Sequence, residues 1–128
     1  ITVDNVISGT GAVTKLLSNT VTLTGDSTYT GTTTISAGTL KIGGGGTTGS
    51  LAATAIANAG TLAFDRSDTM TIAGVISGAG SVTQAGNGTT ILTGANTYTG
   101  TTSIAAGGTL QIGNGASGTL GTGATTND

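Results

Sequence analysis

The sequence predicts an all-β fold, a parallel β-helix (β-solenoid) whose short strands stack coil upon coil along one axis. Three observations predict it. The composition is dominated by residues that form strands and turns, a long internal repeat of 69–70 residues is present, and a shorter period of about 20–23 residues recurs within it.

The composition favours strands joined by many tight corners. The 128 residues include 25 glycines and 31 threonines, whereas charged residues make up 6% and aromatic residues 2%. Threonine, valine and isoleucine suit pleated strands, and glycine supplies the positive-φ corners between them. The absence of proline excludes a collagen, and a net charge of -2 with a mean hydropathy of +0.27 argues against intrinsic disorder. We therefore expect an all-β protein with a thin aliphatic core.

Low charge excludes several classes of partner. Three basic residues, Lys15, Lys41 and Arg66, are too few to neutralise a phosphate backbone, so we expect no nucleic-acid binding. No apolar run approaches the roughly 20 residues of a membrane helix, so we expect no direct membrane insertion of this segment. Since the chain begins without a methionine, we interpret it as an excised or processed fragment.

Two copies of one unit account for most of the chain. Residues 6–38 align without a gap on residues 75–107, and 20 of the 33 pairs are identical. Gly108 is then inserted, after which the match resumes. We expect a single β-helix segment over residues 1–128, made of copies 6–74 and 75–128 and truncated at both ends.

A shorter period within each copy predicts the coils. Residues 39–42 (TLKI) recur at a step of 22 as 61–64 (TLAF), and 81–84 (SVTQ) follow at a further step of 20. Three coils within the offset of 69 would make each step about 23. Apolar and polar residues alternate in each run, so Leu40, Leu62 and Leu110 are expected in one interior column. The competing fold is an antiparallel sandwich or barrel, which needs no fixed coil length.

The second copy resembles a known bacterial repeat. Residues 92–102 (LTGANTYTGTT), followed by 108–115 (GTLQIGNG), look like the passenger-associated β-strand repeat of autotransporters, and residues 62–69 are similar to its linking turn. The resemblance implies a right-handed, single-stranded parallel β-helix within a passenger exported across the outer membrane of a Gram-negative bacterium. It also implies attachment at the cell surface through a translocator barrel that is not among these residues.

Two glycine-rich segments invite functional interpretations. Residues 113–118 match G-x-G-x-x-G, but a dinucleotide site needs a helix after that turn and an acid further on, and neither pattern follows. Residues 43–46 are four glycines, which occur in calcium-binding solenoids, but no aspartate accompanies them to supply oxygen ligands. We interpret both segments as corners of the coil and expect no cofactor and no metal.

Two polar groups remain as candidates. Residues 65–68 (DRSD) carry two carboxylates, the groups that glycoside cleavage uses, yet the chain has no histidine, and a solvated turn with a local ion pair explains them better. The threonines at 28, 30 and 32, repeated at 97, 99 and 101, could order water as an ice-binding surface does, or could simply be exposed strand positions, with Tyr29 and Tyr98 on the opposite face. We expect no catalytic residue and no enzyme activity.

These features together predict a structural role. The leading hypothesis is a non-catalytic stalk or spacer segment of a secreted passenger, which contacts the neighbouring repeats of its own chain. One alternative is end-to-end assembly with other copies into an extracellular filament, because unpaired strand edges invite pairing. Another is an adhesin surface that binds glycan or host protein.

Overall fold

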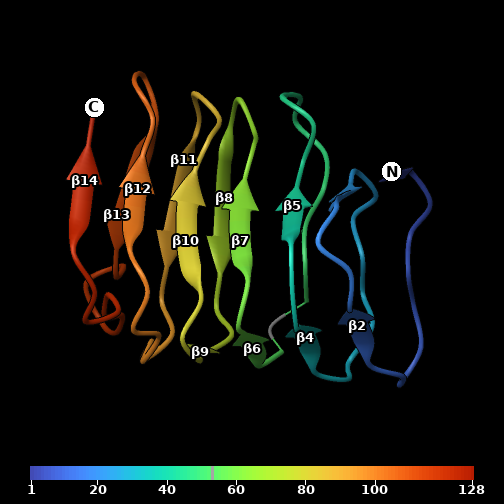
Figure 1. The fold of residues 1–128 in the computed structure, drawn as a ribbon. Coiled ribbons are helices and arrows are strands. Elements are labelled where there is room, and N and C mark those ends of the chain that lie inside the picture. Colours follow the sequence, from blue (N-terminus) through green and yellow to red (C-terminus); the bar gives the residue numbers. More distant parts are fainter. Residues whose placement is uncertain (53) are drawn as a thin grey trace.

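A computed structural model describes residues 1–52 and 54–128. Its short strands lie side by side in successive coils, with the N- and C-terminal coils at opposite ends of the stack (Figure 1). The strands are β1 (Thr2–Val3), β2 (Val13–Lys15), β3 (Thr20–Leu23), β4 (Thr33–Ile35), β5 (Thr39–Ile42), β6 (Ile56–Asn58), β7 (Thr61–Phe64), β8 (Thr69–Ile72), β9 (Ile76–Ser77), β10 (Ser81–Gln84), β11 (Thr89–Leu92), β12 (Thr102–Ile104), β13 (Thr109–Ile112) and β14 (Thr125–Asn127).

The strands form three parallel sheets that run along the stack. The seven-stranded sheet has the order β1-β3-β5-β7-β10-β12-β14, the four-stranded sheet β2-β4-β6-β9, and the three-stranded sheet β13-β11-β8. Each strand pairs with the strand of the next coil, and every pairing is parallel. The predicted parallel β-solenoid is confirmed, and the antiparallel alternative is excluded.

The register of the seven-stranded sheet sets the length of a coil. One outward-facing row contains Thr2, Thr22, Lys41, Ala63, Thr83, Ser103 and Thr126. The residue number rises from 2 to 126 over six coils, so the mean step is about 20.7, with single steps from 19 to 23. The predicted step of about 20–23 residues is confirmed, and at this mean step an offset of 69 makes about three and one third coils instead of three.

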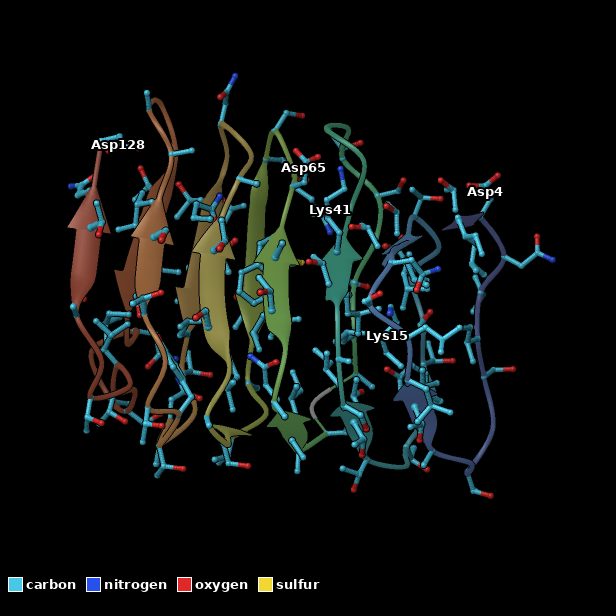
Figure 2. All side chains as sticks on the ribbon, viewed as in Figure 1. Asp4, Lys15, Lys41, Asp65 and Asp128 are labelled. Atoms are coloured by element: carbon cyan, nitrogen blue, oxygen red, sulfur yellow. The ribbon has the colours of Figure 1, made fainter. Side chains whose placement is uncertain are left out.

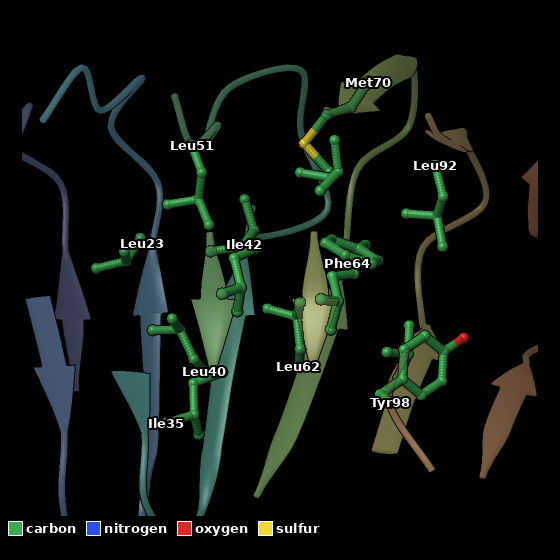
Figure 3. Packing of buried hydrophobic residues seen from close by; sticks show 14 of the residues in the cluster. Leu23, Ile35, Leu40, Ile42, Leu51, Leu62, Phe64, Met70, Leu92 and Tyr98 are labelled. Atoms are coloured by element: carbon green, nitrogen blue, oxygen red, sulfur yellow. The ribbon is translucent and has the colours of Figure 1, made fainter. Parts of the chain in front are cut away.

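The core consists of rows of side chains that face inward from successive strands (Figure 3). Leu40 pairs with Leu62 and Leu62 with Val82, as the short period predicted, and all three are at most 1% exposed. Leu110 does not belong to this row. It pairs with Thr90 in the three-stranded sheet, because one copy does not complete a whole number of coils.

A column of glycines lies at the corner that precedes the seven-stranded sheet. A Cβ on Gly60 would overlap the carbonyl oxygen of Gly38, and one on Gly80 would lie 2.5 Å from the carbonyl oxygen of Gly60. A Cβ on Gly100 would overlap the carbonyl oxygen of Gly80 in the same way. Only glycine lets successive corners approach this closely, so these residues fix where the coil turns.

Candidate functional site

The charge cluster at residues 65–68 forms a clamp on the preceding coil. Arg66 donates from Nε and Nη2 to the two carboxylate oxygens of Asp68, at 2.7 Å each. The same guanidinium donates to the carbonyl oxygens of Gly49 at 3.0 Å and Thr47 at 2.6 Å. The local ion pair predicted from the sequence is present, and its cation also binds the backbone of the loop in the neighbouring coil.

This arrangement suits binding of the chain itself. The bidentate bond from Arg66 lowers the pKa of the Asp68 carboxyl, and the same bond, which Arg66 donates to Asp68, is the main cause that raises the pKa of Arg66. The other carboxylate, Asp65, bonds to Lys41 Nζ of the preceding coil at 2.8 Å (Figure 2). Both carboxylates are thus bonded to cations of the chain itself.

The Lys41–Asp65 ion pair was not predicted from the sequence. The two residues are 24 positions apart in the sequence. They lie in adjacent coils because the step from β5 to β7 is 22 residues, close to that interval. A search for opposite charges separated by one coil would have found the pair.

The two glycine-rich segments are one structural element that occurs twice. Residues 43–49 and 113–118 follow the matching strands β5 and β13. Gly43 and Gly113 open the loops with φ of +91° and +79°, and Gly49 and Gly118 close them with φ of +100° and +132°. The G-x-G-x-x-G match continues to an isolated bridge at Thr119 and then to strand β14, so the described residues place no helix after it.

Tyr29 and Tyr98 anchor the segments that carry the threonine strips. Each tyrosine is at most 1% exposed, and its hydroxyl lies 2.6 Å from Thr33 Oγ1 or 2.7 Å from Thr102 Oγ1. Burial raises the pKa of Tyr29, and its hydrogen bond to Thr33 opposes part of that rise. The predicted opposite placement of the tyrosines is confirmed, since the flanking threonines are exposed.

The threonine strips do not form one common array. Thr28 and Thr30 donate their backbone N–H groups to Ile7 and Gly9, whereas Thr97 donates to Ile76, in the four-stranded sheet. The two strips lie on different sides of the stack.

A regular hydroxyl surface that was not predicted from the sequence runs along the seven-stranded sheet. The row of outward-facing residues Thr20, Thr39, Thr61 and Ser81 is joined by register across β3, β5, β7 and β10. Ser81 Oγ lies 3.1 Å from Thr101 Oγ1, which extends the row. These residues come from non-equivalent positions of the long repeat, so an alignment of the two copies does not bring them together. Comparing positions separated by one coil, about 20 residues, would have identified the row.

Residues 1–52 and 54–128 contain no detected pocket and no group of three or more side chains able to hold a metal ion. Within the same described part of the chain, no helix could span a membrane. The surface offers rows of uncharged hydroxyls and two bonded ion pairs.

Comparison with known proteins identifies the repeat. The family described as passenger-associated-transport-repeat matches residues 13–42 and 82–112, one match in each copy. These matches begin with β2 and β10 and end with β5 and β13. The chain contains two autotransporter passenger repeats.

A curated relative supports this family. An adhesin, the BmaC autotransporter of Brucella suis biovar 1 (strain 1330), is 52% identical over 75 residues, which is 57% of this chain. The chain spans about 2% of that protein's length. No solved structure matches the chain. As a passenger repeat, the chain belongs at the extracellular surface of a Gram-negative bacterium.

Proposed function

We propose that this segment is a rigid, non-catalytic spacer in a long surface passenger. The observation that supports the proposal is the uninterrupted register from Thr2 to Thr126, in which every coil is bonded to the coils before and after it. Bending such a stack requires breaking several strand pairings at once, so the backbone hydrogen bonds between coils make the segment rigid.

The charged and buried polar groups support the same role. Arg66 binds the neighbouring coil, and Asn58 and Asn96 bond backbone groups of adjacent coils. These side chains stabilise corners rather than surround a substrate. We propose that the passenger is held at the outer membrane by a translocator domain and that this segment extends other domains away from the cell.

Length is the property that a spacer supplies. With coils 4.7–4.9 Å apart, one copy of about three and one third coils adds about 16 Å. Exchanging this segment, within its passenger on the cell, for an unrelated β-solenoid of equal length should preserve function. Exchanging it for a solenoid half as long should impair function. Loss of function with the equal-length exchange would contradict the proposal.

Adhesion is the second candidate, because the Brucella suis relative is named an adhesin. The hydroxyl row of Thr20, Thr39, Thr61 and Ser81 is the surface we would assign to it, since uncharged hydroxyls suit hydrogen bonds to neutral glycans. Glycan-array binding by the 128-residue chain, lost when Thr39 and Thr61 are changed to Lys, would favour adhesion over the spacer. End-to-end assembly stays a prediction that electron microscopy of the chain can test.

A further inference from the structure

The two copies keep the same internal pairing but lie on different sides of the stack. In the first copy, Val13 pairs with Thr33 and Thr33 with Ile56, all in the four-stranded sheet. Their counterparts at an offset of 69, which are Val82, Thr102 and Thr125, pair with the same steps in the seven-stranded sheet. The copy is therefore preserved as a unit and rotated.

A second set of strands moves by the same amount. In the first copy, Thr20 pairs with Thr39 through β3 and β5 of the seven-stranded sheet. Their counterparts Thr89 and Thr109 pair through β11 and β13 of the three-stranded sheet. Following the chain, the next side after the four-stranded sheet is the seven-stranded one, and the next after that is the three-stranded one. Both sets have advanced by one side.

The length of the repeat causes this rotation. The row Val13, Thr33, Ile56 and Ile76 covers three coils and ends at an offset of 63 from its start. The six further positions that complete the offset of 69 take the chain from Ile76 to Val82, on the next sheet. A coil in this region has three sides, so each copy adds three coils and one side.

We infer that tandem passenger repeats of this length present their equivalent surface groups on the three sides of the rod in rotation. A group returns to its original side after three copies, which is ten coils or about 48 Å. Neighbouring copies present it about 16 Å apart along the axis and about a third of a turn apart around it.

This rotation determines which partners can use every copy. A flat surface or an extended polymer lying along one side meets an equivalent group only at every third copy. Separate soluble molecules can bind at each copy without crowding, because successive sites face different directions. The inference concerns display geometry, and it holds whether the segment acts as a spacer or as an adhesin.

Spin labels on the 128-residue chain can test the rotation, since the sequence contains no cysteine. The equivalent pair T20C and T89C lies on different sheets, whereas T20C and S81C lie in one row, three coils apart. Dipolar spectroscopy should give about 14 Å between the attachment points of the T20C/S81C pair and a clearly longer distance for T20C/T89C.

Two further variants keep the test independent of one labelling position. The equivalent pair T30C and T99C should give the longer distance, and the same-row pair T22C and T83C the shorter one. Circular dichroism of each variant checks that the sheets are retained. If the two equivalent pairs gave distances as short as the same-row pairs, the copies would be unrotated and the inference overturned.

Discussion

Lys15 and Gln84 occupy equivalent positions of the two copies, at an offset of 69, and each bonds the corner that follows its own strand. Lys15 Nζ donates to the carbonyl oxygen of Leu17, two positions ahead, and to Asn19 Oδ1, four positions ahead, at 2.9 Å. Gln84 Nε2 donates to the carbonyl oxygens of Gly86 and Gly88, two and four positions ahead, at 3.1 Å each. A lysine and a glutamine thus have the same structural role, because each is a buried side chain at the end of a strand that supplies donors to the corner that follows.

Replacing Gln84 should reveal how much that role stabilises the fold. Q84L removes the donors and leaves the carbonyls of Gly86 and Gly88 without this partner, so the free energy of unfolding should fall by about 1–3 kcal/mol. Q84K restores a donor of the kind found in the first copy and removes Oε1, which has no partner in the structure, so it should cost less. Urea unfolding measures both, with T83A as an outward-facing control. A more stable Q84L than Q84K would contradict this account.

The glycine column should tolerate no side chain. G80A places a Cβ 2.5 Å from the carbonyl oxygen of Gly60 and from Asn58 Oδ1, which forces the coils apart. We expect a loss of about 1–3 kcal/mol in the free energy of unfolding. G46A is the matched control, because nothing lies within 4 Å of the Cβ it would add. Thermal unfolding followed by circular dichroism should separate them, and equal midpoints would show that the close approach is unimportant.

Alkaline pH should weaken the fold through Tyr29. Burial raises the pKa of this tyrosine, so the folded chain holds the phenolic proton more tightly than the unfolded chain does. Its contribution is complete below the ordinary pKa of 10.0 and is lost as the pH rises through the raised pKa. At neutral pH, Y29F should have a free energy of unfolding about 1 kcal/mol below that of the wild type, because it lacks the hydrogen bond to Thr33. Its free energy of unfolding should, however, fall less than that of the wild type when the pH is raised. Parallel pH dependences for the two proteins would refute this prediction.

Arg66 should hold the loop at residues 43–49 against the neighbouring coil. R66A removes the donors to Thr47 and Gly49, so the loop amides should exchange hydrogen faster. R66K should give intermediate rates, because one ammonium cannot reproduce the planar fork that binds Asp68 at two oxygens. Hydrogen exchange by mass spectrometry measures the loop exchange rates of the wild type, R66K and R66A, and amides of β11 serve as the internal reference. Unchanged loop exchange in R66A would rule out the clamp.

Acid should release the same clamp. The Arg66 bond lowers the pKa of the Asp68 carboxyl below its ordinary value of 3.8, so the stabilisation is present above that pH and is lost as the pH falls through the lowered pKa. Loop exchange, corrected for the intrinsic pH dependence, should rise in strong acid for the wild type. D68N, which cannot titrate, should show a smaller change over the same range.

The sequence allowed the fold class to be predicted because its signal is local and repeated. Alternation in residues 39–42 and 61–64 indicated strands, and their recurrence at a step of 22 indicated parallel stacking, which pairs Leu40 with Leu62. The alternation also predicted that Tyr29 and Tyr98 lie on the face opposite the threonines that flank them. The clamp was only partly predicted, because Arg66 binds the backbone carbonyl oxygens of Thr47 and Gly49. Every residue has such an oxygen, so the residue type does not indicate which of them accepts a hydrogen bond.

The sequence alone therefore determined the strand pattern, the coil-to-coil step and the long repeat by which the family is identified. Only the tertiary structure decided the side on which each element lies, and so placed Leu110 beside Thr90 instead of in the row of Leu40. The physical reason is that rotation around the axis accumulates over the whole length of a copy. Coil-to-coil steps from 19 to 23 each satisfy local pairing, but their sum sets whether the next copy returns to the same side.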